Sequence, residues 1–279
     1  MFDVSNKNIL ITGATSGIGR ESALALAKMG ANITFIARNK LKAENLLNDI
    51  NKISNGQNSF IVADLSSQKD IKIASEDYMN KNISLDVLLN NAGLINFKRK
   101  VTIDGFEETF AINHLAYFSL TNLLLDKIKE SSSSRIINVS SGAHQFVKRM
   151  NFDDIQSEKS YKPFQVYGYT KLANILFTKK LSSILKNEKI TVNCLHPGVV
   201  GTSFGQNNSN NINKILSFIA KPFMRTSKKG AETSIYLCSS SDVSNISIRS
   251  STCTRSGVVP RLRSAIRYRV RERRPPPRS

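Results

Sequence analysis

The stretch Thr12-Gly-Ala-Thr-Ser-Gly-Ile-Gly-Arg20 follows directly on the apolar run Asn8-Ile-Leu-Ile-Thr12. Gly13 allows the chain to turn tightly out of a strand, while Gly17 and Gly19 allow the backbone to approach a pyrophosphate. A glycine cluster alone indicates no more than a tight turn, but here a strand precedes it and an amphipathic segment follows it. The start of that segment would offer free N–H groups and a partial positive charge to phosphates. We therefore expect a dinucleotide-binding turn made by Gly13, Thr15, Ser16, Gly17, Ile18 and Gly19.

Apolar runs and helical stretches alternate along most of the chain. Strands joined by crossover helices pair in parallel, and strands that are apolar on both sides fit a sheet covered on both faces. The expected fold is an α/β doubly wound parallel sheet, a Rossmann fold, in a single domain over residues 1–248. Gly30 is expected to cap the first helix. The expected strands are 8–12, 32–37, 59–63, 85–90, 135–140 and 190–195, and the expected helices include 20–29, 40–51, 106–129 and 167–185.

The second expected strand ends in Phe35-Ile-Ala-Arg38-Asn-Lys40, without an acid. An Asp or Glu at this place would accept hydrogen bonds from the ribose 2′-OH of NAD, whereas a guanidinium pairs with the 2′-phosphate of NADP. Arg38 therefore favours NADP(H) as the cofactor. The alternative is an arginine that only lies in solvent.

The net charge of +19 is distributed unevenly. Residues 249–279 hold ten Arg, no Lys and one acid, Glu272, which gives +9 of the total. This Arg/Pro-rich tail has no sustained apolar periodicity and is not expected to pack into a core. It is either a basic binding arm or the product of a reading-frame error or a junction with foreign sequence, and the complete change in residue usage near Ile248 favours the latter. Ten arginines would attract phosphates in a salt-dependent way, but no base-reading motif accompanies them, so no specific nucleic-acid partner is expected.

The remaining composition is that of an intracellular protein. Three cysteines and three histidines form neither a disulfide framework nor a zinc spacing, so no metal is expected. No apolar run approaches the roughly 20 residues that span a bilayer, and the first residues do not form a signal peptide. We therefore expect a cytoplasmic protein without a transmembrane segment.

Further motifs follow the glycine turn in a fixed order. They are Asp64-Leu65, Asn90-Asn-Ala-Gly93, Asn113, Asn138-Val-Ser-Ser141, Tyr167-Gly-Tyr-Thr-Lys171 and Pro197-Gly198. In this order and spacing the chain resembles the short-chain dehydrogenase/reductases over residues 5–240. The resemblance implies hydride transfer between NADP(H) and a carbonyl or alcohol substrate. It also implies that the cofactor binds against Asp64, Leu65, Asn91, Ala92, Gly93, Tyr167, Lys171, Pro197, Gly198 and Val200.

Within the family the chain is most similar to the branch of the retinol dehydrogenases and WW-domain oxidoreductases. The segments that carry this are Asn113-His-Leu-Ala, Ser140-Ser-Gly-Ala-His144, Asn151-Phe-Asp-Asp-Ile-Gln-Ser-Glu-Lys159, YGYTKLANILF from Tyr167, and His196-Pro-Gly-Val-Val200. Enzymes of that branch often carry an N-terminal membrane anchor, which we do not expect here. Family members continue after the position of Ser247 with a strand like Gly-Lys-Tyr-Phe. Ile248-Arg-Ser-Ser stands there instead, so the last strand is expected to be missing or replaced. Members are commonly homodimers or homotetramers, and the sequence does not choose between these states.

The resemblance implies that Tyr167 donates a proton in reduction and accepts one in oxidation. A free phenol has a pKa near ~10, so it needs help at neutral pH. Lys171 lies one helical turn on, and its positive charge would lower the pKa of Tyr167. The resemblance also implies that Lys171 binds the nicotinamide ribose. Tyr169 is the rival, but it lies only two residues from Lys171 and points elsewhere on a helix.

Two further residues complete the implied catalytic set. Ser141 would hold the substrate oxygen and stabilise developing charge. Strand alternation turns one of Ser140 and Ser141 away, and the family pattern selects Ser141. Asn113 would position a water that links Lys171 to solvent, and its alternative role is packing between helices.

Residues 201–225 follow the sixth expected strand, where a substrate lid would lie. The apolar face of 212–224 would line a hydrophobic pocket, make peripheral contact with a membrane surface, or pack into the core. We hypothesise an apolar substrate, namely an aldehyde, a ketone, or a retinoid-like or sterol-like molecule. The alternative function is a catalytically idle NADP(H)-binding protein that senses redox state or scaffolds partners. The complete set of Ser141, Tyr167 and Lys171 argues against it, because a pure binder needs no proton relay.

Overall fold

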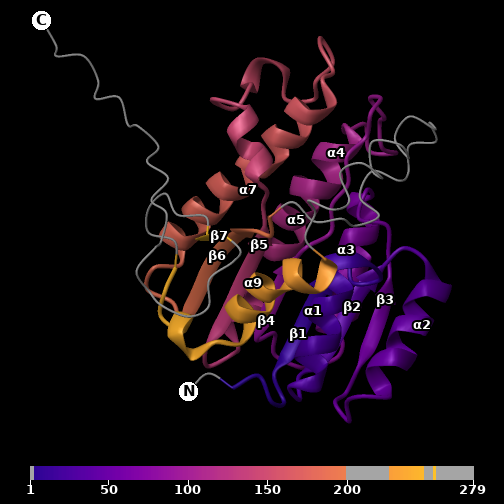
Figure 1. The fold of residues 1–279 in the computed structure, drawn as a ribbon, viewed down its shortest axis with the longest axis vertical. Coiled ribbons are helices and arrows are strands. Elements are labelled where there is room, and N and C mark those ends of the chain that lie inside the picture. The colour runs from indigo at the N-terminus through magenta and orange to yellow at the C-terminus, as the bar shows by residue number, and fades with distance from the viewer. Residues whose placement is uncertain (1–2, 199–225, 248–253, 256–279) are drawn as a thin grey trace, which may run out of the picture.

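The computed structural model describes residues 3–198, 226–247 and 254–255. Its centre is a parallel sheet with the strand order β3-β2-β1-β4-β5-β6-β7, the doubly wound arrangement that the sequence predicts (Figure 1). The chain runs outward from β1 to β3 and then returns to β4 on the other side of β1. The carboxyl ends of β1 and β4 therefore form the switch point at which such sheets bind nucleotides. The strands are β1 (Asn8–Thr12), β2 (Asn32–Ala37), β3 (Ser59–Val62), β4 (Val87–Asn90), β5 (Ser134–Val139), β6 (Ile190–His196) and β7 (Thr254–Arg255).

Helices cover both faces of this sheet, because alternate residues of each apolar strand point to opposite sides. Ile11 and Leu89 face a core closed by α1, α2 and α9, and Figure 1 shows α1 and α9 side by side. Leu10 and Leu88 face a second core closed by α3, α5, α6 and α7. Within the described ranges, no helix combines the length and the apolar content needed to cross a bilayer. The helices are α1 (Gly17–Lys28), α2 (Lys40–Asn51), α3 (Gln68–Met79), α4 (Glu108–Phe110), η1 (Ala111–Leu115), α5 (Ala116–Leu123), α6 (Leu125–Lys129), η2 (Gly142–Phe146), η3 (Phe152–Asp154), α7 (Pro163–Ile184), α9 (Ser227–Ser239) and η5 (Ser241–Val243).

The expected helices 106–129 and 167–185 differ most from those observed, while α1 begins three residues before the expected 20–29. The stretch 106–129, predicted as one helix, divides into α4, the π-helical turn η1, α5 and α6. No Gly or Pro lies in this stretch, so no ordinary breaker signal marks the divisions. The helix predicted over 167–185 begins earlier, at Pro163, because a proline fits the first turn of a helix.

The position beyond β6 is taken by a very short strand. Thr254 and Arg255 pair in parallel with Leu195 and His196. The family pattern has a full strand at this edge, and the part of it that the structure describes here is two residues long. This agrees with the prediction that the last strand is missing or replaced.

Asp86 joins the amino ends of the central strands. This residue precedes β4 and is 4% exposed. Its carboxylate accepts hydrogen bonds from Lys7 Nζ at 3.0 Å, from the backbone N–H of Asn8 at 2.8 Å and from Ser131 Oγ at 2.7 Å. A buried charge that is paired and fully hydrogen-bonded is stable, whereas its removal leaves buried donors without acceptors.

The substitution Asp86→Ala is expected to lower the free energy of unfolding by about 2–4 kcal/mol, because three donors lose their acceptor. Urea denaturation followed by circular dichroism measures this value. The matched control is Asp126→Ala at an exposed aspartate, which should change stability by less than about 0.5 kcal/mol. Equal urea midpoints for the two variants would show that Asp86 does not hold the strands together.

Candidate active site

The glycine-rich turn between β1 and α1 has no room for a side chain at Gly13 or Gly19. Gly13 has a φ of +67°, which other residues rarely adopt, and a Cβ on it would lie 2.7 Å from Ala92 Cα. A Cβ on Gly19 would collide with the carbonyl oxygen of Gly13. Ser16 precedes α1 without capping it, so its side chain does not compete with a phosphate for the first amides of the helix. The turn, which also contains Thr15, Gly17 and Ile18, therefore fits the pyrophosphate of a dinucleotide.

Asn91 and its neighbours attach this turn to the end of β4. The Asn91 side-chain amide donates to the carbonyl oxygens of Thr12 and Gly13 at 3.0 and 3.2 Å. Thr12 Oγ1 in turn accepts the backbone N–H groups of Asn91 and Ala92 at 2.9 and 3.0 Å. A Cβ on Gly93 would lie 3.3 Å from Asn113 Oδ1 and 3.5 Å from Lys171 Nζ. Asn91 and Ala92 thus shape the turn, and Gly93 borders the predicted catalytic residues.

Arg38 and Asp64 meet beyond the carboxyl ends of β2 and β3. Arg38 Nη1 lies 3.7 Å from Asp64 Oδ2, and 62% of the Arg38 side chain is exposed. Asp64 also accepts the backbone N–H of Ser66 at 2.9 Å, which fixes its orientation. Leu65 is buried in the core on the α3 side of the sheet. The exposed guanidinium lies near the expected nucleotide site. It stays available to bind a phosphate, because an exposed ion pair of this length is weak.

Ser141, Tyr167 and Lys171 come together at the carboxyl end of β5. Ser141 follows this strand and precedes η2, and its side chain is hydrogen-bonded to the Tyr167 hydroxyl. Lys171 Nζ lies 5.5 Å from the centre of the Tyr167 ring and 5.7 Å from that of Tyr117. Ser140 points the other way, as alternation predicts, and its hydroxyl donates to the Lys171 carbonyl at 2.8 Å. The structure thus places the three predicted residues within one small site.

Burial pushes both titratable groups of this site toward their neutral forms. It raises the pKa of Tyr167 to about 12, against the effect of the Ser141 hydrogen bond. It lowers the pKa of Lys171, which is 2% exposed, to about 7. The lysine charge that was expected to lower the pKa of Tyr167 is therefore itself opposed by burial. At neutral pH the phenol keeps its proton, which is the form that a proton donor needs.

The lowered pKa of Lys171 makes stability depend on pH. An unfolded chain carries this lysine with a pKa near ~10.4, so it binds more protons than the folded chain between about pH 7 and pH 10. The stability of the wild type relative to Lys171→Met is therefore expected to rise with pH in that window, by at most about 1.4 kcal/mol per pH unit. Urea denaturation at stepwise pH measures the difference, with Lys180→Met at an exposed position of α7 as the control. If Lys171→Met and Lys180→Met vary alike with pH, Lys171 titrates in the folded state as it does in solvent.

Asn113 supports the site through contacts that use its whole side chain. Its Oδ1 accepts the backbone N–H of Leu94 at 2.8 Å, and its Nδ2 donates to the Leu94 carbonyl at 2.9 Å and to Thr170 Oγ1 at 3.2 Å. It lies in η1, and π-helical turns of this kind are frequent at functional sites. The predicted role of Asn113, which is to position a water that links Lys171 to solvent, stays a prediction.

The structure adds supporting residues that sequence reasoning missed, and it leaves one predicted residue out. Thr12, Thr170 and Tyr117 were not singled out, although Tyr117 is buried and donates to the Ala92 carbonyl at 2.7 Å. A run of polar residues at helical spacing in Tyr167-Gly-Tyr-Thr-Lys-Leu-Ala-Asn was the available signal for this side of α7. Pro197 and Gly198 lie just beyond β6, and Gly198 N–H donates to His196 Nδ1 at 3.1 Å. Val200 and the proposed lid over 201–225 fall outside the described residues.

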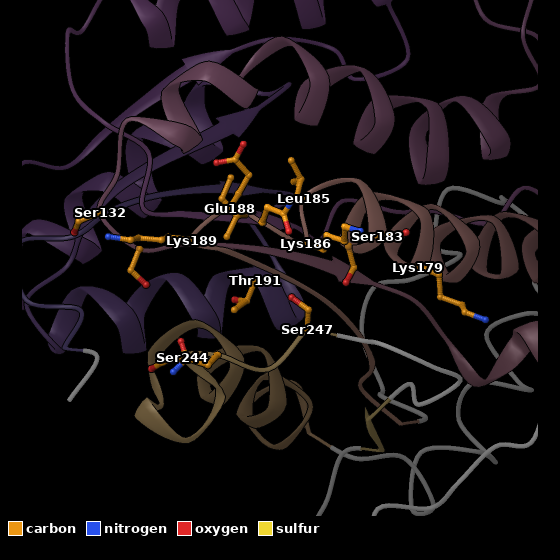
Figure 2. A pocket seen from close by; sticks show the side chains of 15 residues that line it. Ser132, Lys179, Ser183, Leu185, Lys186, Glu188, Lys189, Thr191, Ser244 and Ser247 are labelled. Atoms are coloured by element: carbon orange, nitrogen blue, oxygen red, sulfur yellow. The ribbon is translucent and has the colours of Figure 1, made fainter.

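A cavity of about 860 Å³ lies at the opposite end of the sheet (Figure 2). Ser133 before β5 and Lys189 before β6 line it, together with Thr191 and Ser247. It is open, and its lining is mainly serine and lysine. Ligands of doubly wound sheets bind outside the carboxyl ends of the strands, so this cavity is separate from the candidate active site.

Comparison with known proteins now places this site in a family. A model of the family described as short chain dehydrogenase matches residues 7–213. The chain belongs to the short-chain dehydrogenase family. Its members are oxidoreductases, and the matched residues include the glycine turn and the Ser141, Tyr167 and Lys171 site. The resemblance stated from the sequence motifs is confirmed.

The chain is also similar to proteins of the branch that the sequence indicates. It is 38% identical to retinol dehydrogenase 14 of Mus musculus over 256 residues, which are 87% of this chain and 76% of that protein. It is 37% identical to retinol dehydrogenase 12 of Homo sapiens over 260 residues, which are 92% of this chain and 81% of that protein. A solved short-chain type dehydrogenase/reductase from Mycobacterium marinum has the same fold, with a TM-score of 0.71 at 21% identity over 88% of this chain and 93% of that one.

Proposed function

We propose that this short-chain dehydrogenase transfers a hydride between NADP(H) and an apolar carbonyl or alcohol substrate. The observation that carries the proposal is the hydrogen bond between the Tyr167 hydroxyl and the Ser141 side chain, with Lys171 Nζ 5.5 Å from the tyrosine ring. The site stands at the carboxyl end of the sheet, beside a turn that fits a pyrophosphate. The proposed acid Tyr167, the proposed oxyanion donor Ser141 and the cation Lys171 thus lie next to the proposed dinucleotide site.

The residues that would hold the cofactor divide between its two ends. The turn from Gly13 to Gly19 and the first amides of α1 would bind the pyrophosphate. Arg38, exposed at the end of β2, would pair with a 2′-phosphate, and the lack of an acid there supports NADP over NAD. When bound, the cofactor supplies or accepts the hydride. Lys171 would bind the nicotinamide ribose.

The proton chemistry follows from the environment of Tyr167. Burial keeps the phenol protonated at neutral pH, so Tyr167 is ready to give its proton to a substrate oxygen. The Ser141 hydroxyl, already bonded to that phenol, would bind the same oxygen and stabilise its developing charge. A protonated Lys171 would favour the phenolate that remains after transfer. In reduction Tyr167 would give up its proton, and in oxidation the phenolate would take one from the alcohol.

The substrate class rests on the relatives. Those at 36–38% identity are named retinol dehydrogenases, whose named substrate is a long apolar alcohol. The test is NADPH consumption by the purified chain against short polar and long apolar aldehydes. We expect kcat/KM to be at least about tenfold higher for the long apolar aldehydes, because added buried methylenes each contribute about 0.8 kcal/mol. A preference for short polar aldehydes would reject the apolar assignment, and no NADPH-dependent turnover of any carbonyl would reject the function.

A further inference from the structure

A polar stripe runs along the buried face of α7. It comprises Tyr167, Lys171, Asn174 and Thr178, which follow one another at about one helical turn on one side of the helix. Asn174 and Thr178 are both 0% exposed. A buried amide is costly unless it is fully hydrogen-bonded, so Asn174 needs specific partners inside the core.

Those partners determine how the Asn174 amide is oriented. Its Nδ2 donates to the Asn113 carbonyl oxygen at 2.9 Å and, over a longer 3.4 Å, to the Val139 carbonyl oxygen. Both acceptors are carbonyls, which only accept, so the nitrogen must face them and Oδ1 must face the other way. There it lies 2.9 Å from His114 Nδ1, which must therefore carry the proton and donate. Burial and the charge of Lys171 both lower the pKa of His114, which supports a neutral ring.

Asn174 and Lys171 share an acceptor. Lys171 Nζ donates to the Val139 carbonyl oxygen at 3.1 Å, the same atom that the Asn174 amide contacts. The titratable groups around Lys171 are Tyr167 on α7, Tyr117 on α5 and His114 on η1. β5 contacts Lys171 through the Val139 carbonyl, and Gly93 lies beside Lys171 at the end of β4. The amide thus competes with the ammonium for the Val139 carbonyl oxygen.

We propose that Asn174, oriented by His114, is a positioning residue that holds the Lys171 ammonium beside Tyr167 by sharing the carbonyl oxygen of Val139 with it. The inference rests on the proposed function, because it assigns Asn174 to the same site. Without the amide, the ammonium is the side-chain donor that remains to the Val139 carbonyl oxygen. Lys171 is then drawn toward that oxygen and away from the phenol and the ribose site.

The direct test is the pKa of Lys171 in the full-length protein without cofactor. Lysine labelled with ¹³C at Cε is followed by NMR over a pH titration, and its resonance is assigned with Lys171→Arg. Asn174→Leu leaves the Val139 carbonyl oxygen to the ammonium and is expected to raise the Lys171 pKa by about half a pH unit or more. Asn174→Asp places a carboxylate beside the ammonium and is expected to raise it by about one to three pH units. The same variants should move the limb of the kcat/KM pH profile that reports Lys171 in the same direction.

Thr178→Val is the matched control, since it removes a hydroxyl from the same buried stripe without touching the carbonyl that binds Lys171. It should lower stability and leave the Lys171 pKa within about 0.3 pH units of the wild type. His114 is partly exposed and offers a second route if the Asn174 variants fail to fold. His114→Leu should shift the Lys171 pKa upward, and His114→Gln, which keeps a donor for Asn174 Oδ1, should restore the wild-type value.

The outcomes separate this inference from the proposed function. A Lys171 pKa that is unchanged in Asn174→Asp and His114→Leu overturns the positioning role, whatever the activity. A shifted pKa in a chain that turns over no carbonyl supports the positioning role, while the proposed function fails on its own test.

Discussion

Tyr167→Phe is expected to lower kcat for carbonyl reduction by about 10²- to 10⁴-fold, the usual contribution of a positioned general acid. The phenylalanine fills the same space, so the ring still packs near Lys171 while the proton donor is gone. The affinity for NADPH should stay within about twofold of the wild type, because phenylalanine keeps the ring that the resemblance places against the cofactor. Steady-state NADPH consumption gives the rate, and fluorescence titration gives the affinity.

Tyr169→Phe is the matched control for this experiment. It removes the same hydroxyl two residues away on α7, on a different side of the helix. Its kcat should fall by less than about twofold. If Tyr169→Phe is the slow variant and Tyr167→Phe is fast, the acid has been misassigned. If both remain fast, the proton comes from solvent and the chain needs no tyrosine.

Most of the fold could be predicted from short-range patterns. The glycine turn and the apolar runs locate the central strands to within a residue or two, because strands buried on both faces of a sheet are rich in apolar residues. The divisions of 106–129 could not be predicted in this way. The π-helical turn η1 carries no breaker residue, and its widening depends on what packs against Asn113 in the folded state. The two-residue strand β7 likewise depends on pairing with Leu195 and His196, which local sequence does not show.

The candidate site likewise has one part that the sequence predicts and another that depends on tertiary contacts. Tyr167 and Lys171 are four residues apart, so helix geometry alone brings them to one face. Asn113 and Asn174 are 61 residues apart and meet only because η1 packs against α7 in the folded chain. The lowered pKa of Lys171 also follows from burial, which a sequence does not show. The residue types thus indicate the chemistry of the site. The contacts that set the orientation and the pKa of these residues come from parts of the chain that are distant in sequence.

Arg38→Asp is expected to reverse the preference between the two nicotinamide cofactors. The wild-type guanidinium would contribute about 1.5–3 kcal/mol through charge-assisted bonds to the 2′-phosphate of NADPH. An aspartate loses those bonds and repels the phosphate, while it accepts hydrogen bonds from the 2′-OH of NADH. The ratio of dissociation constants for NADPH and NADH should therefore change by about 10³-fold, which follows from adding the lost bonds to the repulsion. Fluorescence titration with each cofactor measures the ratio without any need for a substrate.

Two further variants show whether such a change is due to Arg38 itself. Asp64 lies beside this residue, so the new aspartate would also face a like charge. Arg38→Ala avoids that repulsion and should still weaken NADPH binding by about 10- to 10²-fold, with NADH binding nearly unchanged. Lys28→Ala removes the same charge at the far end of α1, where a general effect of net charge would act equally on both cofactors. A cofactor ratio that stays at the wild-type value in Arg38→Ala would mean that the guanidinium lies in solvent, and the assignment of NADP would then have to rest on another residue.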